Sequence, residues 1–122
     1  MRRIEGYRVA TGWSAAEIQE QVKKSLDEGY EPVDSLSLVW VPTLKEEQYC
    51  QTLVKYSDGA RLAEDYQIVI VTSFEEIEGS ANFEDSVNKK IQDGYEPVGG
   101  ATQLWLPLGE VFWFVQAVVK YR

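Results

Sequence analysis

The amino-acid sequence predicts an α+β fold in which one βαββ unit occurs twice in tandem. Residues 22–56 align with residues 87–121, a shift of 65 positions, without any gap. The run GYEPV occurs in both segments, and QTLVKY in the first matches QAVVKY in the second. Both segments also show the same order of patterns, in which a helical apolar stripe is followed by two alternating stretches. The repeat therefore indicates two related units rather than a solenoid.

Two units of this size fit within one compact domain. The chain has 122 residues, the length of an ordinary domain. We expect the units at residues 1–56 and 66–122, joined by a linker at residues 57–65 that contains the turn signal Asp58-Gly59. Because this linker is short, the units should pack closely. The expected arrangement is a two-layer, pseudo-twofold domain with an antiparallel sheet and two helices on one face.

Each unit is expected to contain one amphipathic helix. Apolar residues recur at every fourth position, namely Ile18, Val22 and Leu26 in the first unit and Phe83, Val87 and Ile91 in the second. Ser14, followed three residues later by Glu17, forms a capping box that predicts where the first helix begins. Asn82 is the expected cap of the second helix, and the insert EEIEGS at residues 75–80 is expected to precede it.

Alternating segments predict three strands in each unit. They lie at residues 7–10, 33–41 and 48–56 in the first unit and at residues 66–72, 98–106 and 111–121 in the second. In the last of these strands both rows of side chains include apolar residues, so both faces should be covered. One helix covers only one face of its unit. The other face should therefore meet the partner unit or another chain.

Charge and composition restrict the classes of function. The 20 acidic and 12 basic residues give a net charge of −8, and such a field repels polyanions, so we expect no DNA or RNA binding. A single cysteine, Cys50, allows no intramolecular disulfide, which fits a reducing compartment. The longest apolar stretch, at residues 111–119, is far shorter than the about 20 residues of a membrane helix. We expect a cytoplasmic protein without membrane insertion.

The residues that most enzymes use are missing. The chain has no histidine, which removes the His-based nucleophile systems and the usual His-containing metal sites. It also has no phosphate-binding loop of the Walker or dinucleotide type. Acidic residues gather at residues 75–85, where a solvated face at a helix start is favoured over a cation site. We therefore expect no enzymatic activity, no cofactor and no metal.

Polar residues repeated within the apolar return strands are the first candidates for a binding site. Gln51 recurs as Gln116, and Lys55 recurs as Lys120. An amide and an ammonium group could line a ligand site near the sheet. The alternative, which we favour, is that these residues lie on a partly wet face with the lysine stems along aromatic rings.

Aromatic residues and one linker arginine are further candidates. Tyr95 and Trp105, which repeat Tyr30 and Trp40, could stack on a planar base, although core packing is the simpler interpretation. Arg61 could bind an anion. It could equally form a surface ion pair with a neighbouring carboxylate, which would contribute little to stability.

The second unit carries a motif pattern that is fairly specific. Residues 83–121 read FEDSVNKKIQDGYEPVGG, then a hairpin, then FVQAVVKY. This segment resembles a small bacterial and phage domain of unknown function with the pattern G-[WY]-x-P-x-GG followed by Q-A-x-V-K. Residues 18–56 are a degenerate version, with Asp34-Ser35 where the family has two glycines. In the second unit, those glycines would let a ligand or a neighbouring backbone approach closely. The family name itself implies no activity.

A looser similarity, in size and setting only, is to phage anti-defence proteins of the Thoeris system that sequester nucleotide immune signals. The leading hypothesis is a non-enzymatic small-ligand-binding protein, such as a phage or prophage sponge for a cyclic nucleotide or a cyclic ADP-ribose-type signal. The alternative is a protein-interaction or assembly module without a small ligand. We expect a homo-oligomer. The candidate ligand-binding residues are Arg61, Tyr95, Gly99, Gly100, Trp105, Gln116 and Lys120.

Overall fold

The computed structural model describes residues 3–59, 61–106 and 109–122 and has an α+β fold. The first unit consists of β1 (Ile4–Gly12), α1 (Ala15–Asp27), β2 (Glu31–Val41) and β3 (Glu46–Tyr56). The second consists of β4 (Ala63–Ser73), α2 (Glu76–Gln92), β5 (Tyr95–Pro97), β6 (Thr102–Leu106) and β7 (Val111–Tyr121). The predicted α+β class is confirmed. Strands β1 to β4 extend beyond their predicted bounds, β7 matches them, and β4 begins within the expected linker.

The strands form two antiparallel sheets. The first sheet has the order β1-β3-β2, and the second has the order β4-β7-β5, with β6 also paired to β7. The pairing registers correspond between the sheets. Tyr7 of β1 pairs with Val54, and Tyr66 of β4 pairs with Val119, which follows Val54 by the same 65 positions as the sequence repeat. Tyr7 and Tyr66 therefore occupy corresponding positions.

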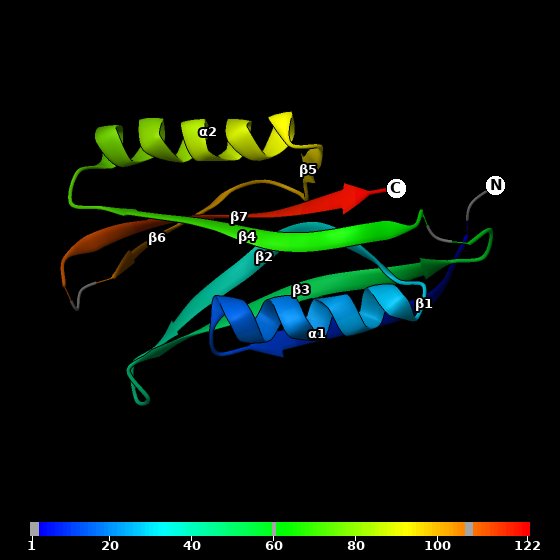
Figure 1. Cartoon of the computed structure of the whole chain (residues 1–122). Helices are drawn as coiled ribbons and strands as arrows, with labels where there is room; N and C mark the ends of the chain where they lie inside the picture. The colour runs from blue at the N-terminus through cyan, green and yellow to red at the C-terminus, as the bar shows by residue number, and fades with distance from the viewer. Residues whose placement is uncertain (1–2, 60, 107–108) are drawn as a thin grey trace.

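The two helices lie on opposite sides of the second sheet (Figure 1). Helix α2 covers one face of it, while α1 packs on the first sheet and along β4. The expectation of two helices on one face is therefore wrong. Strand β7 is apolar on both faces, so stacking the second sheet on the first unit buries a row of side chains that α2 alone cannot cover.

The main hydrophobic core lies between the two units. Its buried members from the first unit are Ala10, Ile18, Val22, Leu36, Leu38, Tyr49 and Leu53, and those from the second are Tyr66, Val98, Val115, Ala117 and Val119. A smaller cluster between α2 and the second sheet contains Val69, Phe83, Phe114 and Val118. Residues 114–119 of β7 are buried without interruption. The prediction that both faces of this strand are covered is confirmed.

The packing between the units is not reciprocal. Helix α1 lies along β4, but among the described residues α2 has no contact of comparable extent with β1. Tyr66 is buried, whereas Tyr7 at the corresponding position is 68% exposed. A twofold axis would give corresponding residues the same surroundings. The structure therefore does not show the expected pseudo-twofold relation, and the second unit instead stacks on the first in a head-to-tail manner.

Helix α1 begins as the sequence predicts, whereas α2 begins earlier. The Ser14 hydroxyl accepts a hydrogen bond from the backbone nitrogen of Glu17 at 3.1 Å. The second helix starts at Glu76, so the insert forms its first turns and Asn82 lies inside it. Acidic side chains in the first turn favour this earlier start. Gly79 makes the start sterically feasible, because a Cβ there would lie 2.6 Å from the Phe114 ring.

Of the strand expected at residues 98–106, only residues 102–106 are extended, as β6, and the short strand β5 precedes them. Strand β5 ends at Pro97 and β6 begins at Thr102. The first unit shows a milder irregularity at the same place, where the pairing of β2 with β3 shifts between Val33 and Ser37. Corresponding residues in the two units, Asp34 and Gly99, have φ values of 62° and 66° in the left-handed region. Asp and Gly both tolerate that conformation.

Candidate functional site

A buried glutamine occupies the corresponding position in the central strand of each sheet. Both side-chain nitrogens donate hydrogen bonds to three backbone carbonyl oxygens. For Gln51 the acceptors are Val33 (2.9 Å), Asp34 (3.3 Å) and Thr52 (3.1 Å), and for Gln116 they are Val98 (3.0 Å), Gly99 (3.4 Å) and Ala117 (3.0 Å). The glutamines thus fasten the irregular segment of each unit to its central strand. Their N–H groups are used by the fold.

Beside Gln51 of the first unit, the space is filled by strand β4 of the second unit. The Tyr66 hydroxyl donates to Oε1 of Gln51 at 2.7 Å. Two residues further along β4, the backbone nitrogen of Ile68 donates to Oε1 of Gln19 on α1 at 2.8 Å. Strand β4 is therefore held by the central strand of the first sheet and by the flank of α1.

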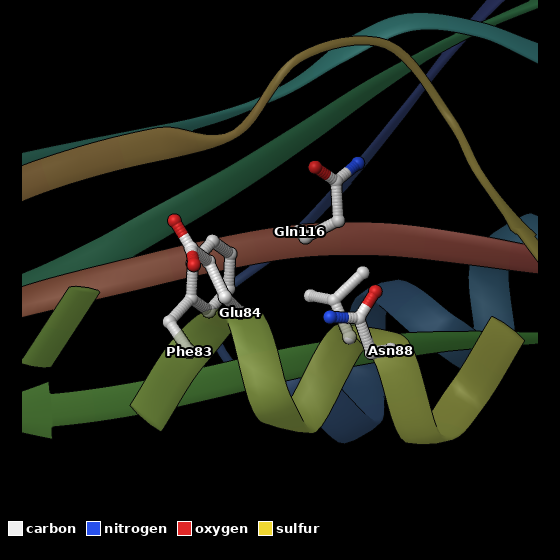
Figure 2. Close-up of a pocket in the computed structure, with 5 residues that line it drawn as sticks. Phe83, Glu84, Asn88 and Gln116 are labelled. Atoms are coloured by element: carbon white, nitrogen blue, oxygen red, sulfur yellow. The ribbon is translucent and has the colours of Figure 1, made fainter. Parts of the chain in front are cut away.

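In the second unit, the corresponding space is an open groove beside α2. Its volume is about 340 Å³, and it is lined by Phe83, Glu84, Val87, Asn88 and Gln116. Figure 2 shows Glu84 and Asn88 extending from α2 and Gln116 extending from β7. No described residue donates a hydrogen bond to Oε1 of Gln116, and no atom of this side chain is both buried and unsatisfied. The oxygen is therefore available to an occupant of the groove.

An acidic hydrogen-bond network lies at the edge of β4. The hydroxyl of Tyr95 donates to Asp65, the side-chain nitrogen of Gln67 donates to Asp65 at 2.9 Å, and Lys23 of α1 forms an ion pair with it at 3.0 Å. Burial alone would raise the pKa of Asp65, but these partners hold it at about 2. Burial and the bond to Asp65 raise the pKa of Tyr95 to about 12. Tyr95 is thus fixed by this network instead of being available to stack on a base.

Arg61 lines a second cavity, of about 240 Å³, between the two units. Its guanidinium donates to Glu96 at 2.8 Å and lies 3.7 Å from the centroid of the Tyr121 ring. Its backbone nitrogen donates to Glu31 at 3.3 Å. The hydrogen bond that Arg61 donates to Glu96 raises the pKa of Arg61. An anion would have to displace Glu96, so this geometry fits the ion-pair alternative, although with a partner that the sequence did not indicate.

The two glycines of the second unit lie against the first unit. A Cβ at Gly99 would lie 2.4 Å from the backbone nitrogen of Ser35. The backbone nitrogen of Gly100 donates to the Ser35 hydroxyl at 2.9 Å, and the Thr102 hydroxyl donates to the carbonyl of Leu36 at 2.6 Å. Of the two interpretations of these glycines, the structure supports the close approach of a neighbouring backbone.

The seven predicted residues do not form one site. Gly99 and Arg61 line the cavity between the units, and Gln116 lines the groove. The ammonium group of Lys120 lies 5.7 Å from the centroid of the Tyr95 ring, which fits the packing interpretation. The ring of Trp105 packs against Phe112, with the centroids 4.8 Å apart, and is 46% exposed, so it is not a core residue.

Sequence reasoning missed the helix side of the groove. Glu84 and Asn88 occur in α2 where Gln19 and Lys23 occur in α1, and these α1 residues hold β4. The 65-residue shift aligns these pairs, but their importance is visible only once the contacts of α1 are known. Patterns within α2 itself mark only its apolar stripe.

The chain matches no family model, no curated protein and no solved structure. Among the described residues, no helix has both the length and the apolar character that crossing a membrane requires. The described residues also contain no group of three His, Cys, Asp or Glu side chains that could hold a metal ion. A proposal about function must therefore rest on the geometry of this chain.

Proposed function

We propose that the protein is a non-catalytic interaction module that binds another protein through the outer face of its first sheet. Tyr7, Val9 and Val39 are 68%, 47% and 55% exposed. They pair with alternate residues of β3, so their side chains share one face of the sheet. This apolar and uncovered face is the observation that carries the proposal, because apolar side chains gathered on one face are typical of contact surfaces.

The second unit supports this interpretation by comparison. The corresponding face of its sheet carries Tyr66 and Ile68 on β4, and it is packed into the main core. The same face of the βαββ unit is thus used for packing once within the chain. Strand β1 is also an edge strand of its sheet, and its unpaired backbone groups add to the capacity for contact.

Substitution of the exposed face tests this function. The variant Tyr7→Lys/Val9→Lys should keep its melting temperature, because both side chains are exposed, and should lose the protein associations of the parent chain. Native mass spectrometry of protein isolated from its own host would report these associations. Leu44→Lys, which places a lysine at another exposed apolar position, is the matched control. Unchanged associations in the double variant would contradict the proposal.

The groove beside α2 favours a second candidate function, the binding of a small ligand. Its volume of about 340 Å³ lies within the range of small-molecule pockets. Gln116 would offer an acceptor and the α2 stripe an apolar wall, but Glu84 at the rim repels phosphate. A nucleotide signal is therefore a weaker proposal than an uncharged ligand.

A thermal-shift panel of uncharged compounds, cyclic nucleotides and cyclic ADP-ribose-type compounds tests this candidate. A ligand at 100 times its Kd should stabilise the protein by about 2.7 kcal/mol. A panel in which no compound shifts the melting temperature would contradict the binding of a small ligand.

A further inference from the structure

We propose that the groove beside α2 receives strand β1 of a second copy of this chain, so that copies associate head to tail. This inference rests on the proposed function and names the partner. Within one chain, β4 of the second unit already fills the corresponding space beside α1 of the first unit. Among the described residues, the groove beside α2 and strand β1 are left uncovered, and they correspond to the two complementary halves of the interface that joins the units.

The groove side repeats the residues that hold β4. Each residue that lines the groove corresponds, by the 65-residue shift, to a residue of the first unit that packs on β4 or bonds to it. The pairs are Phe83 with Ile18, Glu84 with Gln19, Val87 with Val22, Asn88 with Lys23 and Gln116 with Gln51. The members from the first unit are the core residues Ile18 and Val22 and the polar partners of β4. The second unit thus has a complete set of residues for receiving such a strand.

The strand side repeats β4 in the same register. Strands β1 and β4 are both edge strands of their sheets. Tyr7 corresponds to Tyr66 and Val9 to Ile68, because each pair faces corresponding residues of the central strand. Alternate backbone nitrogens of an edge strand point away from its sheet. The nitrogen of Val9 therefore points outward, as that of Ile68 does where it donates to Gln19.

The hydrogen bonds of the internal contact can be formed again between two copies. The Tyr66 hydroxyl donates to Oε1 of Gln51 at 2.7 Å, and the Tyr7 hydroxyl of a second copy would donate to Oε1 of Gln116. The Val9 nitrogen would donate to the carboxylate of Glu84, which takes the place of the Gln19 amide oxygen. Tyr7, which is 68% exposed in the single chain, would be buried against the apolar wall of α2. Burial of its apolar surface favours association.

The residues that correspond to the internal ion pair are uncharged on both sides of the proposed contact. Within the chain, Lys23 and Asp65 form an ion pair at 3.0 Å. The corresponding residues between copies are Asn88 on the groove side and Gly6 on the strand side. Neither of them is charged, so the contact would bury no unpaired charge at this point, which would otherwise be costly.

The remaining surfaces indicate a reversible contact. Val115 and Ala117 of the buried face correspond to Cys50 and Thr52 of the exposed face. On the groove side, Leu38 of the core corresponds to Gln103, which is exposed. Both uncovered halves are thus more polar than the halves buried within the chain. This composition suits a surface that is in contact with water whenever the copies separate.

Sedimentation equilibrium on the full chain tests the proposal with two complementary variants. Tyr7→Lys damages the strand side, and Glu84→Lys/Asn88→Lys blocks the groove with exposed substitutions on α2. The wild type should associate as its concentration rises, and each variant alone should be monomeric. An equal mixture should give a one-to-one dimer and nothing larger, because one intact groove and one intact strand remain. Far-UV circular dichroism would verify that both variants are folded.

Tyr7→Phe probes the hydrogen bond by itself. It should weaken association by about three- to tenfold, the effect of losing one neutral hydrogen bond. Tyr66→Phe should reduce stability without weakening association, because its hydroxyl bonds within the chain. Leu44→Lys should associate like the wild type.

Two outcomes would overturn the inference, namely a wild type that stays monomeric at about 1 mM and a mixture of the two variants that stays monomeric. If Tyr7→Lys abolishes association while the groove variant associates normally, the exposed face binds elsewhere. The proposed function would then stand and the head-to-tail contact would be wrong. If Tyr7→Lys changes no association of any kind, both proposals fail.

Discussion

At the scale of single residues, Asp65 shows how an acidic chain uses a carboxylate to join its two units. Asp65 lies on β4, where it forms an ion pair with Lys23 of α1 and accepts a hydrogen bond from Tyr95 of β5. Burial of a carboxylate disfavours its charged form. Here the donors outweigh burial, and the pKa of Asp65 falls from 3.8 to about 2. The sequence presents Asp65 as one acidic residue among 20, and only the fold brings its partners to it.

Asp65→Asn should remove a stability contribution that depends on pH. Because the folded-state pKa is depressed, the contribution is present above the unfolded value near 3.8 and is lost as the pH falls through about 2. Its size at pH 7 is about 2 kcal/mol. Urea unfolding of wild type and variant between pH 2 and pH 7 should show curves that converge at low pH. Asp85→Asn, at an exposed position on α2, is the matched control for removing one carboxylate.

At the scale of elements, the sequence predicted the helices and strands better than their ends. The capping box located the start of α1 because it consists of local contacts. The start of α2 was predicted wrongly, because Gly79 and the acidic insert become helical only where α2 passes over Phe114. The break between β5 and β6 was missed for the same kind of reason. It depends on Gly99 meeting Ser35 of the other unit, and no pattern within the strand reports that contact.

Gly99→Ala should be far more harmful than an alanine at another glycine of similar conformation. Gly99 has a φ of 66° and its Cβ would lie 2.4 Å from a backbone nitrogen, whereas Gly59 has a φ of 87° and open space around it. The left-handed conformation costs an alanine about 1–2 kcal/mol at either position, and overpacking against backbone adds about 1–3 kcal/mol at Gly99. Urea denaturation of both variants would measure the difference. Equal losses of stability would contradict the importance of the close approach.

At the scale of the whole molecule, the repeat and the final structure differ in symmetry. The sequence shows two matching units, and from it we expected matching surroundings. The structure stacks one sheet on the other unit, so Tyr66 is buried and Tyr7 is exposed. Of the candidate site, the repeated glutamines were visible in the sequence. The absence of an internal donor to the Gln116 oxygen among the described residues was not visible in the sequence, because it depends on how the two units stack.

The shared core predicts that the two units fold together. Leu36, Leu38 and Leu53 of the first unit share one buried core with residues of the second. A fragment that ends at Gly59 would leave these side chains facing water beside α1 and would retain only part of the core. Such small units with an incomplete core are marginal at best.

Urea unfolding monitored by tryptophan fluorescence would test whether the first unit needs the second to fold. The full chain should unfold in one cooperative transition, because loss of either unit opens the same core. The fragment should show a broad, shallow change without a defined midpoint. A fragment that unfolds cooperatively near the midpoint of the full chain would mean that the first unit is stable without its partner. In that case the core between the units would contribute to assembly rather than to folding.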